Sequence, residues 1–177
     1  MCDQMIDKRR ITSDHIESLE PNEVFVFGSN LQGSHGGGAA CVAFNNFGAV
    51  WGQGVGMQGQ SYAIPTMQGG VDTIAPYVDD FIEYAKNHPE KQFLVTEIGC
   101  GIAGFIPYEI APLFKNAVQI ENISLPESFW CILIPSHDPW YFMMQQREYL
   151  QQKERPTAEE IRQQLEEHKK QRMEKMK

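Results

Sequence analysis

The apolar positions of this chain fall into short runs separated by polar or glycine-rich segments. Four runs predict buried strands, at residues 23–27, 61–66, 92–98 and 129–135. Each is five to seven residues long and is bounded by turn-forming residues, which is typical of strands that are covered on both faces.

Between these runs the apolar residues recur at helical spacing. Residues 39–47 predict a helix that ends at Gly48, and residues 108–119 predict another. Asp72 is expected to cap a helix over residues 73–87, which has Ile74, Tyr77, Val78, Phe81, Ile82 and Ala85 on one face. Strands that alternate with helices predict an α/β fold in three layers, with a mostly parallel central sheet.

The two ends of the chain differ from the middle. Residues 1–20 are polar with weak helical character and are expected to wrap around the domain, which would span residues 21–140. Residues 141–177 are rich in Gln, Glu, Lys and Arg and predict a charged helical C-terminal extension, with a capping box at Thr157 and Glu160. A solvated helix, or a helix that binds a protein partner or a second copy, would each explain this composition.

Cysteine usage and hydropathy point to a compartment. No apolar run reaches the length of a membrane span, and the first residues lack the apolar stretch of a signal peptide. The cysteines Cys2, Cys41, Cys100 and Cys131 form no CxxC pair. We therefore expect a cytoplasmic protein with reduced thiols, no metal site and no membrane contact.

Charge is distributed unevenly along the chain. Residues 147–177 hold 9 of the 15 basic and 7 of the 23 acidic residues, which leaves 6 basic and 16 acidic residues before them, a net −10. Residues 11–85 contain no Lys or Arg. Direct nucleic-acid binding by the body is therefore not expected. A bound anion would be held by backbone N–H groups and helix N-termini.

Glycines mark two candidate loops for such an anion. All 15 glycines lie between Gly28 and Gly104. The loop after the first strand contains three consecutive glycines at residues 36–38, and the loop after the third strand spans residues 99–104. Each loop alone could be an ordinary turn. Two amide-lined loops without basic side chains together suit a diphosphate that joins two sugars.

The second loop also spells G-x-G-x-x-G after a strand, with Glu121 about twenty residues later. This is the pattern of Rossmann dinucleotide-binding proteins, although Pro107 interrupts the expected helix start. A Rossmann-like protein for a different nucleotide is therefore an alternative hypothesis.

Four motifs in order resemble macrodomains, the ADP-ribose-binding modules. They lie at residues 35–40, 44–48, 62–66 and 98–102, and the resemblance covers roughly residues 24–135. The similarity is closest to the type that includes the terminal ADP-ribose protein glycohydrolase. It implies a macrodomain-like fold and a ligand that is ADP-ribose or a related nucleotide diphosphate ribose, free or attached to an ADP-ribosylated macromolecule, with no cofactor.

The resemblance also implies the site residues. Residues 36–39 would approach the distal ribose and the first phosphate, residues 99–104 would form the second phosphate loop, and Phe105 would pack over the distal ribose. The full set of ligand-binding residues is Asn30, His35, Gly36, Gly37, Gly38, Ala39, Thr66, Met67, Gly99, Cys100, Gly101, Ile102, Ala103, Gly104 and Phe105.

Two departures from the family bear on catalysis. The glycohydrolase type has a Lys where this chain has Met67 and an Asp where it has Ala103, and neither replacement supplies a nucleophile or an acid. Whether the chain is an enzyme that removes ADP-ribosyl groups is left open. If the chain is an enzyme, its candidate catalytic residues are Asn30 and His35. His35 is a candidate for proton transfer because imidazole titrates near neutral pH. Glu97, a charge in an apolar strand, needs a partner or points toward the ligand.

Overall fold

The computed structural model describes residues 10–153. The strands of this range form one six-stranded sheet in the order β1-β6-β5-β2-β4-β3. The strands are β1 (Ile11–Thr12), β2 (Glu23–Ser29), β3 (Gly56–Gln58), β4 (Ser61–Pro65), β5 (Gln92–Val95) and β6 (Ile123–Pro126). All neighbouring strands pair in parallel except β3, which runs antiparallel to β4 at the edge. The predicted mostly parallel α/β sheet is confirmed.

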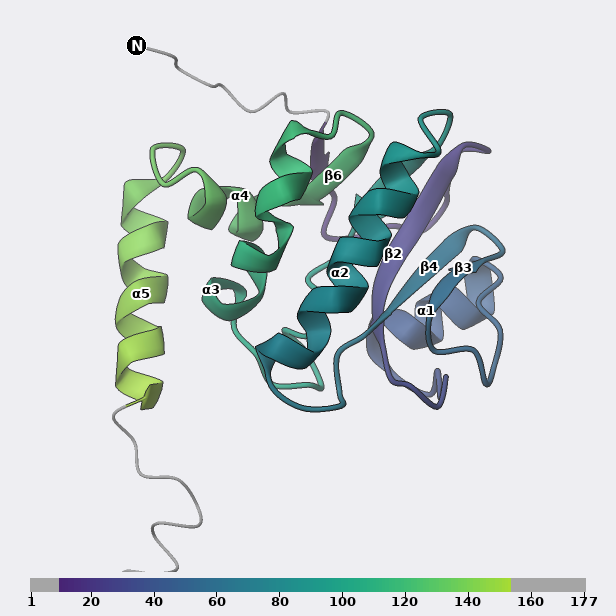
Figure 1. The fold of residues 1–177 in the computed structure, drawn as a ribbon, viewed down its shortest axis with the longest axis horizontal. Helices are drawn as coiled ribbons and strands as arrows, with labels where there is room; N and C mark the ends of the chain where they lie inside the picture. The colour runs from purple at the N-terminus through teal and green to yellow at the C-terminus, as the bar shows by residue number, and fades with distance from the viewer. Residues whose placement is uncertain (1–9, 154–177) are drawn as a thin grey trace, which may run out of the picture.

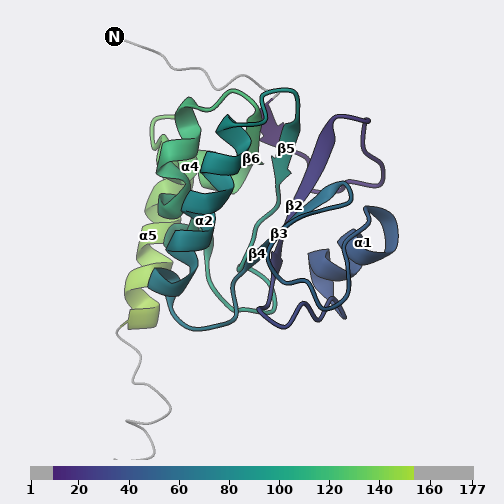
Figure 2. The ribbon, with the colours of Figure 1, turned by 45° about the vertical axis from the view of Figure 1, so that its right-hand side comes forward.

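Helices cover both faces of this sheet. They are α1 (Gly38–Asn46), α2 (Val71–Lys86), α3 (Pro107–Ile110), the 3₁₀ helix η2 (Ala111–Gln119), α4 (Glu127–Leu133) and α5 (Pro139–Lys153). Figures 1 and 2 show α2 and α4 on one face and α1 on the opposite face. This arrangement gives three layers.

The alternation of side chains along β2 divides the core in two. Val24 and Val26 point toward α2 and belong to the larger apolar cluster, which also contains Phe81 and Trp130. The two phenylalanines of β2, Phe25 and Phe27, face the other way and pack with Phe47 and the alanines of α1. Because side chains of a strand alternate between the faces, one buried strand supports both helical layers.

The strand predicted at residues 129–135 is wrong. Residues 127–133 form α4, and the strand that completes the sheet is β6, immediately before it. Every residue from Phe129 to Ile132 is buried. A short, continuously buried run has no periodicity that separates helix from strand, so packing against η2 and α5 decides its conformation.

Three other elements differ from the expectations. Helix α2 begins at Val71 with Gly70 as its N-cap, so Asp72 lies in the first turn and does not cap the helix. The helix predicted over residues 108–119 becomes a 3₁₀ helix after Ile110, because Pro112 cannot donate a backbone hydrogen bond. Strand β5 ends at Val95, three residues early.

The ends of the described chain attach to the domain. Residues 11–12, expected to have helical character, instead form the edge strand β1 against β6. Helix α5 lies beside α3 and α4, with Phe142 and Tyr149 at 5.9 and 5.1 Å from the Tyr108 ring (Figure 1). The capping box expected at Thr157 lies outside the described residues, and the division at residues 20 and 140 stays a prediction.

Arg10 ties the start of the described chain to the end of η2. Its guanidinium donates hydrogen bonds of 2.8–3.2 Å to the backbone carbonyls of Ala117, Val118, Ile120 and Ile123. It also lies 5.0 Å from the Trp130 ring centroid, and Trp130 Nε1 donates to the Arg10 carbonyl at 2.9 Å.

We predict that Arg10→Ala lowers the free energy of unfolding by about 2 kcal/mol, because several partly buried carbonyls lose their donor. Lys86→Ala is the control, since Lys86 makes an exposed ion pair with Glu83 and its loss should cost less than about 0.5 kcal/mol. Urea unfolding of both variants measures the difference. Equal losses would contradict the role of Arg10.

Candidate functional site

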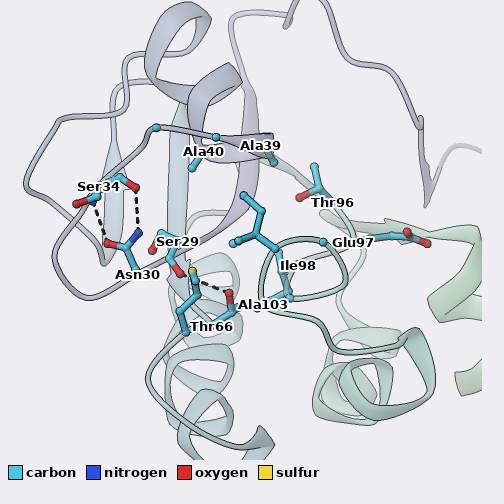
Figure 3. A pocket seen from close by; sticks show the side chains of 18 of the residues that line it. Ser29, Asn30, Ser34, Ala39, Ala40, Thr66, Thr96, Glu97, Ile98 and Ala103 are labelled. Atoms are coloured by element: carbon cyan, nitrogen blue, oxygen red, sulfur yellow. Dashed lines mark hydrogen bonds between the residues drawn. The ribbon is translucent and has the colours of Figure 1, made fainter. Parts of the chain in front are cut away.

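A cavity of about 420 Å³ opens where the carboxyl ends of β2, β4 and β5 meet (Figure 3). Its lining residues are Gly28, Ser29, Asn30, Ser34, Gly36, Gly37, Gly38, Ala39, Ala40, Trp51, Thr66, Met67, Thr96, Glu97, Ile98, Gly99, Gly101, Ile102 and Ala103. The parallel register explains this position, because Ser29 pairs with Pro65 and Val26 pairs with Val95. Loops that leave parallel strands therefore converge at one edge of the sheet, where α/β proteins bind ligands.

The first wall of the cavity is the start of α1. Gly37 is the N-cap residue, and no side chain caps the helix or places a negative charge in its first turn. The first hydrogen bond of the helix runs from Cys41 N–H to the Gly37 carbonyl at 3.3 Å. The N–H groups of residues 38–40 precede it and lack an intrahelical acceptor. They supply a partial positive charge at the cavity.

The second wall is the loop at residues 98–105. Four of its N–H groups make local backbone hydrogen bonds: Ile98 donates to Thr96 O at 2.7 Å, Cys100 to Glu97 O at 3.2 Å, Gly104 to Gly101 O at 3.0 Å and Phe105 to Gly99 O at 2.9 Å. The hydrogen bonds of the described chain do not use the N–H groups of residues 101–103. These residues line the cavity, so unpaired amides border it on two sides.

Glycine allows the two walls to approach closely. A Cβ atom on Gly28 would lie 3.2 Å from the Gly99 nitrogen and 3.3 Å from Thr66 Oγ1. A Cβ atom on Gly37 would lie 3.2 Å from Cδ1 of Ile102, so the tip of the second loop touches the N-cap of α1. The narrow cavity depends on the absence of side chains at these positions.

The cavity is almost without charge. Among the described residues that line it, Glu97 alone has an ionisable side chain. Its carboxylate accepts a hydrogen bond from the Ser128 hydroxyl of α4. In Figure 3 the Glu97 side chain points away from Asn30, Thr66 and Ile98, toward the helices. Ser128 is therefore a hydrogen-bonding partner of the kind that Glu97 was expected to need.

The structure brings eleven of the fifteen predicted binding residues to the cavity, and His35 is not among them. His35 is 1% exposed, and its Nε2 lies 3.0 Å from Val50 O and 3.1 Å from Gln53 O. Because both partners are carbonyls, Nε2 carries the proton. Its ring supports the loop and leaves no nitrogen at the cavity.

Two polar candidates do line the cavity, and both make internal hydrogen bonds. The Asn30 side chain donates to Ser34 O and accepts from Ser34 N, each at 2.9 Å, which closes the loop after β2 (Figure 3). Thr66 is 3% exposed, and its hydroxyl lies 3.4 Å from Ser29 O. Each retains hydrogen-bonding capacity for a ligand.

The other predicted residues outside the lining are Cys100, Gly104 and Phe105, all in the second loop. Phe105 packs against the larger apolar cluster. Burial and the carboxylates of Glu97 and Glu109 raise the pKa of the Cys100 thiol to about 12. A protonated, partly buried thiol is a poor nucleophile, so Cys100 supports the loop.

Sequence reasoning missed several lining residues. Thr96 and Ile98 lie within the strand expected over residues 92–98, but β5 ends at Val95, and the residues that follow it lie at the ligand edge of the sheet. Trp51 lies in the segment between α1 and β3, where the local pattern carries no signal of a cavity. Only the folded chain brings it beside Gly36.

A second cleft adjoins the cavity. It has a volume of about 320 Å³ and lies between residues 13–17, β2 and α1. Ala39 and Thr96 line both spaces. Asp14 and His15 bring polar groups to this cleft, and Phe25 and Val42 bring apolar ones. The two spaces therefore adjoin across the start of α1.

Residues 10–153 contain no group of three or more His, Cys, Asp or Glu side chains arranged for a metal ion. No helix in that range has the length and hydropathy to cross a membrane. Comparisons with protein-family models, curated proteins and solved structures found no significant match.

The electrostatics of the second loop are testable through Cys100. Replacing Glu97 by Gln removes a negative charge beside the thiol, so we predict that the pKa of Cys100 falls and its alkylation by iodoacetamide at pH 8 accelerates about threefold. Mass spectrometry of the peptide that contains Cys100 gives the rate. Glu90→Gln, at an exposed and distant position, is the control and should react like the parent protein. An unchanged alkylation rate in Glu97→Gln would show that the Glu97 carboxylate does not raise the pKa of Cys100.

Proposed function

We propose that this protein binds ADP-ribose, or a related nucleotide diphosphate ribose, across the cavity and the adjoining cleft. The observation that carries the proposal is the pairing of two sets of unpaired backbone N–H groups, at residues 38–40 and 101–103, around one cavity that no cationic side chain of residues 10–153 lines. The order of motifs that resemble macrodomains supports the same ligand.

A diphosphate suits these two walls. Its negative charge would be favoured by the dipole of α1 and by direct N–H donors, which replace the Lys and Arg side chains of other phosphate sites. Ile102 contacts Gly37 across the gap, so a bound diphosphate would be shielded from water on that side. Hydrogen bonds to an anion strengthen as the surrounding dielectric falls.

The two ends of the site differ in a way that orients the ligand. The adenine would lie in the cleft beside residues 13–17, where the Asp14 carboxylate offers an acceptor for an amino group. The distal ribose would lie near Asn30 and Thr66. From the cleft to Asn30 the site would then hold the base, the diphosphate and the distal ribose in that order.

Binding without hydrolysis is the activity we propose. Met67 and Ala103 line the cavity, so the positions where the glycohydrolase type has Lys and Asp hold groups that cannot attack or protonate a glycosidic bond. His35 is 1% exposed and does not line the cavity, so neither of its ring nitrogens is positioned at a ligand there. Among the described lining residues Glu97 is the one ionisable group, and its carboxylate accepts a hydrogen bond from Ser128 and points away from the space between the loops. The lining therefore supplies shape and donors for a ligand.

Gly101 provides a direct test of the proposed function. A Cβ atom there meets no atom within 4 Å, so a side chain would enter open space without strain. We predict that Gly101→Glu weakens ADP-ribose binding at least about tenfold by charge repulsion, whereas the isosteric Gly101→Gln weakens it far less. Isothermal titration of the folded variants measures both affinities.

The same titration distinguishes ADP-ribose binding from the alternative hypothesis of a Rossmann-like protein for a different nucleotide. Wild-type protein should bind ADP-ribose in the micromolar range, about −8 kcal/mol, and bind AMP and ADP more weakly. Equal affinity for AMP or ADP would favour the Rossmann-like hypothesis of a different nucleotide. Absence of ADP-ribose binding, or indifference to Gly101→Glu, would refute the proposed function.

Ser128 is expected to hold the Glu97 carboxylate away from the diphosphate. We predict that Ser128→Ala weakens ADP-ribose binding about threefold, because the freed carboxylate can approach the anion. The double variant Ser128→Ala with Glu97→Gln should bind like the parent protein, since no charge is left to release. Equal losses in the single and double variants would show that Ser128 acts only by packing.

A further inference from the structure

Trp51 is an unusual member of the cavity lining because it is large, apolar and 57% exposed. The described chain contains two other tryptophans. Trp130 is buried in the core, and Trp140 is exposed on α5, outside the cavity lining. Exposing an indole costs free energy that burial beneath a ligand would recover.

The Trp51 ring is held in place by its neighbours. The Phe44 ring lies 5.8 Å away at 74°, and the His35 ring lies 6.3 Å away at 77°, both edge-to-face. His35 is itself fixed by its two carbonyl partners. A Cβ atom on Gly36 would lie 4.0 Å from Cη2 of Trp51. A fixed aromatic ring loses little conformational entropy when a ligand covers it.

The surroundings of Trp51 restrict what can bind there. The chain has no Asp, Glu, Lys or Arg between Glu23 and Asp72. Trp51 lies within this stretch, as do the neighbours that hold it. A cationic or anionic group at this end would therefore find no ionic partner from this stretch. A flat ring that stacks on an aromatic face needs none, and a ring with a delocalised positive charge, such as nicotinamide in NAD, is also attracted to the indole face.

Trp51 also lies at a defined end of the proposed site. It lines the cavity with Asn30, Ser34 and Gly36, whereas Ala39 and Thr96 are the residues shared with the adjoining cleft. In the orientation given above, the base lies in that cleft and the distal ribose near Asn30. A substituent on the distal ribose would then extend toward Trp51.

We infer that Trp51 forms a stacking subsite for a heteroaromatic ring attached to the distal ribose. The inference rests on the proposed function and narrows its ligand class from ADP-ribose to ADP-ribose that carries a planar ring at its far end. NAD, in which nicotinamide occupies that position, is the probe for this subsite.

The test compares two ligands across matched variants. Trp51→Ala should weaken NAD binding about tenfold, within the range of base stacking on aromatic side chains, and change ADP-ribose binding by less than about twofold. Trp51→Phe keeps a ring and should retain most of the NAD affinity. Trp140→Ala replaces an exposed tryptophan outside the cavity and should bind both ligands like the parent protein.

Quenching of tryptophan fluorescence gives an independent readout. In a Trp140→Phe variant, Trp51 and the buried Trp130 remain, so acrylamide quenches mainly Trp51. Bound NAD should protect Trp51 from acrylamide, and bound ADP-ribose should protect it much less.

Each outcome decides between the two proposals. Equal losses of NAD and ADP-ribose affinity in Trp51→Ala, or no loss of NAD affinity, would overturn the stacking subsite while ADP-ribose binding still supports the proposed function. Trp51-dependent binding of NAD without any ADP-ribose binding would support the subsite and refute the proposed function. Failure of both ligands to bind would overturn both.

Discussion

The parallel pairing of β2 with β4 and β5 is the constraint on which the candidate site depends. It brings the carboxyl ends of three strands to one edge, so their loops must share a small volume. Gly28 lets the backbones meet, because a side chain there would press on Gly99 and Thr66. The alternating side chains of β2 then anchor a helical layer on each face.

The electrostatics of the site follow from what its lining lacks. The described lining residues provide unpaired amides from the α1 N-terminus and the second loop, and no cation. Glu97 is directed toward Ser128, which keeps its charge out of the space between the loops. Backbone recognition of this kind depends on loop geometry, and that geometry is maintained by contacts of buried groups such as His35.

Prediction from sequence succeeded where local signals agree. The runs at β2 and β4 and the helical spacing of α2 identified elements whose burial and propensity point the same way. Prediction failed at α4, where continuous burial of residues 129–132 fits either conformation. The strands β1 and β3 have only two and three residues, too few to show a period.

The sequence by itself determined the α/β class, the two glycine loops and most of the residues that line the cavity. The fold class and the two loops follow from local composition and from the rule that loops of parallel strands converge, whereas the individual lining residues follow from the resemblance to macrodomains. The tertiary structure alone decided that Trp51 borders Gly36, that Glu97 bonds to Ser128 and that His35 is buried away from the cavity. Each of these features depends on how whole layers of the fold pack against one another. The spacing of residues in the sequence does not determine those distances.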